Sequence, residues 1–194
     1  IAEPRWIYLS SLGEESVEFH RAIEEYLWNH PKVKFAFQPG TLQIKLGKDK
    51  LAGLYRRADA FFCNKEEAQR ILGSTEDDIE TLMRLIAGLG PKIVAITDGV
   101  NGAYAHDGKE TWQMPIYPDP KPPLQRTGAG DAFSSTFTVA LALGKSMKEA
   151  LMWGPINSMS VVQGIGARAG LLNRSQLAEW LVKAPKDYVP KSLS

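Results

Sequence analysis

The sequence predicts an α/β fold, a three-layer sandwich in which helices flank a mostly parallel central sheet. Short β-rich runs alternate with longer helical patterns, and this alternation is typical of βαβ units. Hydrophobic residues make up 44% and charged residues 23% of the 194 residues, which is ordinary for a globular chain able to bury one sizeable core. No internal repeat, linker or low-complexity stretch interrupts the pattern. We therefore expect a single α/β domain over residues 1–194.

The first half of the chain predicts four strands that alternate with helices. The strands are expected at 5–10, 33–39, 59–63 and 92–97, and the helices at 14–30, 48–57, 65–72 and 76–88. The first of these helices runs from Glu14 toward His30 and places Val17, Ile23 and Leu27 at helical spacing. Because helices separate the strands, the sheet should be mostly parallel and covered on both faces, with 92–97 as a central strand.

The pattern changes after residue 100. Two short runs around Asp107 and Gly108, "GAYAHDGKETWQMP", indicate a β-hairpin. The stretch 115–123, "PIYPDPKPP", contains five prolines in nine residues and must be extended. Three helices are then expected at 129–143, 147–162 and 174–183, with Gly144 and Gly164 near the ends of the first two.

Bulk composition excludes several classes of function. A net charge of +1 gives no reason to expect a nucleic-acid or membrane-surface partner. No stretch approaches the roughly 20 apolar residues that cross a bilayer. One cysteine, Cys63, cannot form an internal disulfide, so a reducing cytoplasm is the expected location. The three histidines are scattered, and their spacing does not resemble a metal site.

The stretch "QRTGAGDAFSS" (125–135) places weak helix formers and a carboxylate at the start of an apolar helix. The first turn of a helix exposes unpaired N–H groups and the positive end of the dipole. Gly128, Ala129 and Gly130 carry almost no side chain, so an anion could approach these N–H groups closely. Asp131 would stand beside such an anion and could receive a hydroxyl proton, as a weak base suited to phosphoryl transfer.

A simpler interpretation of this stretch is equally compatible with its spacing. The glycines would end a loop, and Asp131 would complement the helix dipole, which contributes about 0.3–1 kcal/mol. A phosphate-binding loop of the GxxxxGK[ST] type is excluded because that pattern does not occur. A dinucleotide-binding GxGxxG does not follow the first strand either, which argues against a dehydrogenase.

"TGAGDAF" followed by a long apolar helix resembles the C-terminal signature of the ribokinase-like (pfkB) family of carbohydrate kinases. Members of that family place a D-T-x-G-A-G-D stretch at a helix start. The resemblance implies that the backbone of Gly128, Ala129 and Gly130 forms an anion hole and that Asp131 is the catalytic base. It also implies ATP and Mg²⁺ as cofactors and a small, sugar-like substrate.

"CNKEEA" (63–68) resembles the family's N-x-x-E motif, which organises Mg²⁺ and the ATP phosphates. The resemblance casts Asn64 and Glu67 in those roles, as cofactor-binding and metal-organising residues. The alternative is a capping box, in which Asn at the start of a helix pairs with Glu three residues later. Taken alone, the pattern favours the capping box, and one residue can serve both purposes.

"ITDGVNGAY" (96–104) resembles the family's turn that approaches the ATP phosphates, with Thr97, Gly99 and Gly102 as the matching residues. A plain turn built from Asp-Gly and Asn-Gly pairs explains the same residues equally well. The stretch 157–172 resembles the helix and loop that border the adenine and, in many members, a monovalent cation. Its apolar residues would pack in a core in either case, so no contact is assigned there.

The chain departs from the family signature immediately before the glycines. Gln125, Arg126 and Thr127 stand where the family has D-T-x, whose aspartate often helps to bind an activating potassium ion. Gln125 has no charge and Arg126 adds a cation, so both changes weaken a cation site. Arg126 partly substitutes for the field of the ion in this interpretation. We therefore expect little activation by potassium.

The resemblance covers only about the C-terminal two-thirds of a typical family member. The first strands, the sugar contacts and the small β lid have no counterpart here, so the sequence is expected to be an N-terminally truncated portion of the fold. An uncovered sheet edge would then favour a homodimer. Three functions stay open: a kinase for a sugar hydroxymethyl group, a kinase for a nucleoside or vitamin alcohol, and a catalytically incomplete nucleotide-binding fragment.

Overall fold

The computed structural model describes residues 2–13, 16–166 and 168–193. Within it the chain divides into two compact units. The first unit comprises Ile1–Ile96 and His106–Lys109, and the second comprises Thr97–Ala105 and Glu110–Ser194. The expected start of the first helix at Glu14 and one residue of the 157–172 stretch, Ala167, lie outside the described residues.

The first unit contains the parallel part of the sheet. Its strands are hydrogen-bonded in chain order, and they are β1 (Trp6–Leu9), β2 (Lys34–Phe37), β3 (Ala60–Asn64) and β4 (Val94–Thr97, whose last residue belongs to the second unit). β1 pairs with β2 and β2 with β3, both in parallel. Ile93 bonds to Asp59 and Phe61 on either side, which is the pattern of a parallel pair between β3 and β4. The four predicted strands are confirmed.

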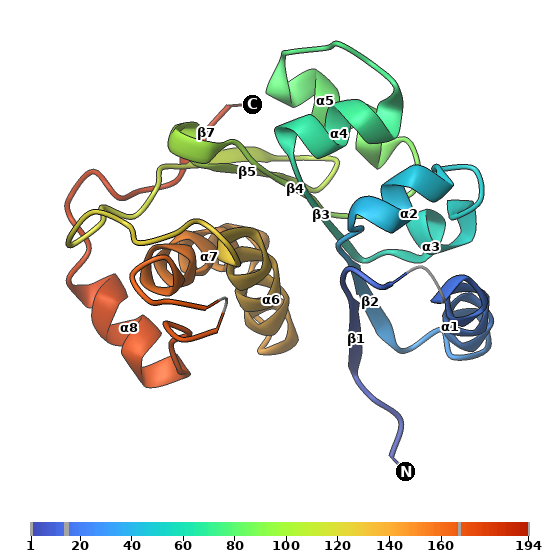
Figure 1. The fold of residues 1–194 in the computed structure, drawn as a ribbon, viewed down its shortest axis with the longest axis horizontal. Helices are drawn as coiled ribbons and strands as arrows, with labels where there is room; N and C mark the ends of the chain where they lie inside the picture. Colours follow the sequence, from blue (N-terminus) through green and yellow to red (C-terminus); the bar gives the residue numbers. More distant parts are fainter. Residues whose placement is uncertain (1, 14–15, 167, 194) are drawn as a thin grey trace. The chain divides into compact units, whose positions relative to one another are not determined.

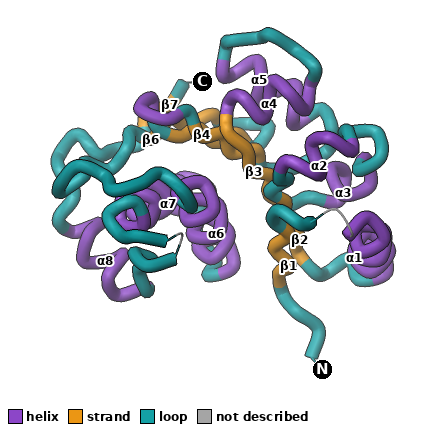
Figure 2. The backbone as a smooth tube through the Cα atoms, viewed as in Figure 1, coloured by secondary structure: helices purple, strands orange, loops and turns teal. Residues whose placement is uncertain are grey.

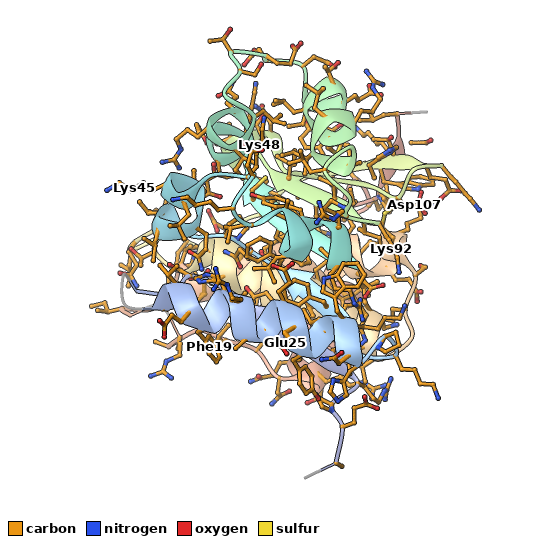
Figure 3. All side chains as sticks on the ribbon, turned by 90° about the vertical axis from the view of Figure 1, so that its right-hand side faces the viewer. Phe19, Glu25, Lys45, Lys48, Lys92 and Asp107 are labelled. Atoms are coloured by element: carbon orange, nitrogen blue, oxygen red, sulfur yellow. The ribbon has the colours of Figure 1, made fainter. Side chains whose placement is uncertain are left out.

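Five helices accompany these strands (Figure 1). They are α1 (Val17–Asn29), α2 (Thr41–Leu46), α3 (Ala52–Arg57), α4 (Lys65–Leu72) and α5 (Ile79–Ala87). Figure 3 shows α1 in front, where Phe19 and Glu25 project from a helix whose outer face is solvent-exposed. The sequence did not predict α2, because six residues are too few for helical periodicity to show. Its start is recognisable only from Gln43, whose side chain accepts from the Gly40 N–H at 3.1 Å.

Aromatic side chains fill the core of the first unit. Phe35, Phe37, Tyr55 and Phe61 are fully or almost fully buried. The ring of Phe37 meets those of Tyr55 and Phe61 edge-on, with centroid separations of 5.5 and 5.8 Å. Such T-shaped pairs add to the stability that burial of the rings provides. The strands are therefore nearly continuous apolar runs, as expected for a parallel sheet covered by helices.

A buried carboxylate ties the strands of the first unit together. Asp59 accepts from Lys92 Nζ at 2.8 Å, Lys34 Nζ at 3.1 Å and Arg57 Nη1 at 3.3 Å. Its other hydrogen bond comes from the Phe35 N–H at 3.0 Å. Burial by itself raises the pKa of this carboxyl, but the hydrogen bonds from Lys92, Phe35 and Lys34 outweigh it and hold the pKa below its usual value.

The second unit combines a short antiparallel sheet with three helices. The strands are β5 (Ala103–His106), β6 (Thr111–Met114) and β7 (Lys191–Ser192), and the helices are α6 (Ala129–Ala142), α7 (Met147–Val161) and α8 (Arg174–Val182). β6 and β7 are antiparallel, with Trp112 opposite Ser192. The chain thus has an α/β fold with a mixed sheet flanked by helices. β7 was not predicted, because two residues carry no strand pattern.

The three predicted C-terminal helices are confirmed, and the proline-rich stretch 115–123 forms neither helix nor strand. Figure 2 shows the long connection from β6 to α6 as loop throughout. α6 and α7 pack along each other (Figure 1). Gly154 of α7 permits this packing, because a Cβ atom there would stand 2.4 Å from the ring of Phe133 on α6. No helix among the described residues is both long enough and apolar enough to cross a membrane.

Asp59 provides a test of the first unit. Replacing Asp59 by Ala removes the acceptor of Arg57 Nη1 and of the Phe35 N–H, and we expect the free energy of unfolding at pH 7 to fall by about 3 kcal/mol. The contribution of a carboxyl with a lowered folded-state pKa is complete above its unfolded pKa, near 4, and disappears as the pH falls through the folded value. The difference between parent and variant, measured by urea unfolding, should therefore narrow below about pH 4. A difference independent of pH would contradict this account.

Candidate active site

The first turn of α6 is built on a glycine in the left-handed conformation. Gly128, the residue before the helix, has φ 86°, which residues with a Cβ rarely adopt. Its carbonyl accepts the first intrahelical bond, from the Ala132 N–H at 2.8 Å. No side chain caps this end of the helix. The sharp turn at Gly128 therefore leaves the start of α6 uncovered by a capping side chain, in contrast to α4, α5, α7 and α8.

The amides predicted to form an anion hole differ in their surroundings. The Ala129 N–H donates to the Arg126 carbonyl at 3.3 Å, so it is already engaged. The Gly130 N–H lies in the first turn, where the helix itself offers no acceptor. A Cβ atom placed on Gly130 would meet no atom within 4 Å. Open space therefore adjoins the backbone at Gly130, where a ligand group can approach.

A cavity of about 250 Å³ opens at this position, and all of its lining residues belong to the second unit. Its walls are the turn after β4, the proline-rich stretch and the facing sides of α6 and α7. The lining residues are Thr97, Gly99, Val100, Gly102, Ala103, Ile116, Tyr117, Asp119, Arg126, Ala129, Gly130, Phe133, Pro155, Ser158, Met159 and Val162. Five predicted site residues, Thr97, Gly99, Gly102, Ala129 and Gly130, are among them. Gly128 and Asp131 are not, although Asp131 follows directly in the first turn of α6 and is exposed.

The turn after β4 approaches another part of the chain very closely. Gly102 has φ 91°, and a Cβ atom there would stand 2.1 Å from the Met114 carbonyl oxygen. The Asp98 N–H donates to the Gly102 carbonyl at 2.8 Å and closes the turn around a short 3₁₀ segment, Gly99–Asn101. A side chain at Gly102 is thus excluded by the backbone alone. Gly99 (φ 49°) has open space instead and presents its backbone to the cavity.

Helix α7 holds the segment that leads into α6. Ser158 Oγ donates to the Ala129 carbonyl at 2.8 Å, and the Leu124 N–H donates to the Val162 carbonyl at 2.9 Å. The Gln125 side chain donates to the Gly164 carbonyl at 3.1 Å. These bonds come from the last turn of α7 and from the residues that follow it, Val162 and Gly164. They fix the signature residues against the helix that forms the opposite wall of the cavity.

Among the described residues, Arg126 is the only cationic one that lines the cavity. Within the described part of the chain its side chain has no hydrogen-bond or ion-pair partner. An unpaired guanidinium, a helix N-terminus and a side-chain-free backbone thus meet in one place. Each of these features favours an anion, and together they suit a phosphate group.

Asn64 and Glu67 lie in the first unit, at the start of α4, and form the capping box. The Glu67 N–H donates to Asn64 Oδ1 at 2.7 Å, and the Asn64 N–H donates to Glu67 Oε2 at 2.9 Å. Among the described residues no group of three histidine, cysteine or acidic side chains could hold a metal ion. Burial raises the pKa of the Cys63 thiol, and the nearby charge of Glu67 raises it further. Cys63 therefore stays a neutral part of the core.

Sequence reasoning missed the wall formed by the proline-rich stretch. Ile116, Tyr117 and Asp119 line the cavity, although the sequence indicated only that 115–123 is extended. The Tyr117 hydroxyl donates to the Trp180 carbonyl on α8 at 2.9 Å, and burial raises its pKa. An acid between two prolines, just upstream of the signature, was the available signal for Asp119. From the stretch 157–172, Ser158, Met159 and Val162 line the cavity.

Comparison with known proteins places the chain in a family. Residues 18–174 match the pfkB family carbohydrate kinases, so the chain belongs to this family. It is 31% identical over 121 residues to a cytidine kinase of Thermococcus kodakarensis, a match that covers 61% of this chain and 42% of that kinase. It is 34% identical over 93 residues to the ribokinase of Bacillus subtilis, covering 48% of this chain and 31% of that enzyme.

The fold is that of the ribokinases. A structure assigned to ribokinase II of E. coli, in complex with ATP and Mg²⁺, superposes with a TM-score of 0.78 at 18% identity. The superposition covers 92% of this chain and 58% of the E. coli chain. The present chain therefore spans well under half the length of these curated relatives and somewhat more than half of the solved structure.

Two glycines of the signature should respond in opposite ways to alanine. Gly130→Ala adds a Cβ to open space and gains helix propensity, so the free energy of unfolding should stay the same or rise by up to about 1 kcal/mol. Gly128→Ala is matched in size but forces a left-handed conformation, and it should lower that free energy by about 1–2 kcal/mol. Thermal unfolding of the two variants beside the parent measures both. Equal effects of the two substitutions would contradict a left-handed conformation at Gly128.

Proposed function

We propose that this chain is the nucleotide-binding part of an ATP-dependent phosphotransferase that acts on a hydroxymethyl group of a sugar or sugar-like small molecule. The observation that carries the proposal is the cavity at the start of α6. There the signature backbone, the turn after β4 and the unpaired Arg126 line one space. Membership of the pfkB family supplies the class of reaction.

The residues divide the chemistry among themselves. The backbone of Gly128, Ala129 and Gly130 forms the anion hole, in which the Gly130 N–H holds the developing negative charge. Asp131, exposed at the mouth of the first turn, takes the proton of the acceptor hydroxyl. Phosphoryl transfer proceeds through a loose transition state, so a weak carboxylate base that also orients the hydroxyl is sufficient.

The turn after β4 and Arg126 serve the phosphates. Thr97 offers a hydroxyl, and Gly99 and Gly102 bring the backbone to the cavity wall. Arg126 supplies a fixed positive charge in place of a bound monovalent cation, because Gln125 is committed to the Gly164 carbonyl. ATP fits this arrangement, because its phosphates need donors and positive charge and its rings need the apolar wall of Phe133, Met159 and Val162.

Magnesium belongs to the proposal through Asn64 and Glu67. Mg²⁺ keeps several waters and is usually held by one or two carboxylates together with the substrate phosphates. A dedicated cluster of acids is therefore not required. When bound, MgATP supplies the phosphoryl group and the metal offsets its charge. Glu67 would help to hold the metal while its Oε2 atom caps α4. The hydrogen bond from the Asn64 N–H to Oε2 would then keep this carboxylate in a fixed position.

The relatives do not identify the compound whose hydroxyl group accepts the phosphoryl group. Cytidine kinase and ribokinase differ in acceptor by name, yet both match parts of this chain. The shared part is thus suited to the nucleotide, which supports a nucleoside or a vitamin alcohol as an alternative acceptor. The chain spans 42% and 31% of those two enzymes, which supports nucleotide binding without transfer as a second candidate function. A homodimer stays a prediction.

Asp131 tests the proposal. In Asp131→Asn the base is lost while the cavity lining is unchanged, so MgATP should bind the variant and the parent with similar affinity in a calorimetric titration. Turnover, measured in a protein that also contains the acceptor site, should fall by about 10²–10⁴-fold when Asp131 is replaced by Asn. The side chain is exposed, and thermal unfolding should confirm that folding is unaffected.

Each possible result decides something about the chain. A variant that kept most of the parent's turnover would remove Asp131 from the chemistry. Saturable binding by both proteins without transfer to any acceptor would favour the nucleotide-binding fragment. Failure of both proteins to bind MgATP would contradict the proposed function as a whole.

Arg126 makes a separate prediction about monovalent cations. With a fixed guanidinium in the cavity, replacing NaCl by KCl at constant ionic strength should change ATP affinity and activity by no more than about twofold. Arg126→Ala should weaken ATP binding in both salts. Strong activation of the parent protein by potassium would show that an ion site persists beside Arg126.

A further inference from the structure

Two opposite charges share the cavity without pairing. Asp119 and Arg126 are the only charged residues that line it in the part of the chain that the structure describes. No salt bridge joins them, although both belong to the described part of the chain. Both side chains are exposed to solvent, where an ion pair contributes little, so neither charge is neutralised within the fold. Each is accessible to a ligand group of opposite polarity.

Asp119 is contacted by Gln163, which lies just after α7. Gln163 Nε2 donates to the Lys121 carbonyl at 3.0 Å and lies 3.4 Å from Asp119 Oδ1. The two prolines that flank Asp119, Pro118 and Pro120, restrict the backbone on both sides. Gln163 Oε1 is buried without a partner, so this arrangement leaves an acceptor unsatisfied. The position of Asp119 is thus set by a rigid segment and one amide.

The chemistry of the lining singles out Asp119. The hydroxyl of Ser158 already donates to the Ala129 carbonyl, and that of Tyr117 to the Trp180 carbonyl. Thr97 is the remaining neutral polar side chain, and the other lining side chains are apolar or absent. An ionised carboxylate only accepts hydrogen bonds. Asp119 is therefore suited to a ligand group that donates, at a site whose walls suit a flat ring.

We propose that Asp119 is a specificity-determining residue of the nucleotide site. Its carboxylate accepts a hydrogen bond from the nucleoside half of the ligand, while the phosphates lie at Arg126 and the start of α6. The donor is the 2′-hydroxyl of the ribose or the amino group of the base, which share this chemistry. The inference rests on the proposed function, because it assumes that the cavity takes a nucleotide.

The direction of the change in nucleotide affinity distinguishes a carboxylate that contacts the ligand from one that only lies near it. A carboxylate that does not touch the ligand would repel the nucleotide phosphates, so its removal would leave affinity unchanged or increase it. A carboxylate that accepts a hydrogen bond stabilises the complex in spite of that repulsion. Removing it should then weaken binding by roughly 10- to 150-fold, the range expected for a hydrogen bond to a charged group.

The experiment is a calorimetric titration of the 194-residue chain and its Asp119→Ala variant with three magnesium-bound nucleotides: ATP, 2′-deoxy-ATP and purine riboside triphosphate. Asp119→Asn keeps the size of the side chain and carries the test if the alanine variant unfolds. Glu179→Ala, an exposed acid on α8 outside the cavity lining, is the matched control for the change in net charge. We expect Asp119→Ala to weaken ATP binding and Glu179→Ala not to.

The analogues identify the donor. If Asp119 contacts the ribose, 2′-deoxy-ATP should bind the parent weakly and lose nothing further in Asp119→Ala. If Asp119 contacts the base, purine riboside triphosphate, which lacks the amino group, should bind the parent weakly and lose nothing further in Asp119→Ala. ATP binding that is equal or tighter in Asp119→Ala overturns the inference while leaving the proposed function intact. No nucleotide binding by the parent protein overturns both.

Discussion

The close packing of α6 against α7 is the constraint on which the candidate site depends. Gly154 lets the ring of Phe133 approach the backbone of α7, and Asn157 donates to Thr136 Oγ1 across the same interface at 2.7 Å. The Ser158 hydroxyl then reaches the Ala129 carbonyl in the first turn of α6. Because the two helices are held this closely, the start of α6 and the end of α7 face one cavity. A wider separation would detach the signature backbone from the apolar wall that completes the site.

The charged groups around Asp59 and those at the cavity differ in how they are paired. In the first unit Asp59 has three cationic partners, and Arg57 donates to the carbonyls of Leu27 and His30 as well. The charges of Asp59 and Arg57 are thus satisfied within the fold, which is the usual condition for buried ionic groups. In the cavity Arg126 has no partner among the described residues, and Asp119 is held only by Gln163. The ion pairs of Asp59 thus support the fold, whereas Asp119 and Arg126 are accessible to a ligand.

Local sequence predicted most of the elements because each carries its own signal. The strands of the first unit are apolar runs bounded by turn residues, and the long helices show clear periodicity. The misses, α2 and β7, are six and two residues long, and tertiary contacts stabilise such short elements. The predicted helix at 48–57 begins only at Ala52, because residues 48–51 form turns instead.

The sequence by itself determined the class of the fold and the residues of the α6 turn. Glycine at 128 and 102 is required by backbone conformation and close approach, which are local properties that a glycine pattern can announce. Only the tertiary structure decided which residues surround the cavity. Asp119 and Ser158 are far apart in the chain and meet there because the proline-rich stretch and α7 are folded against the start of α6. Spacing along a chain records local geometry, whereas a cavity is formed by segments whose separation in sequence carries no signal of their contact.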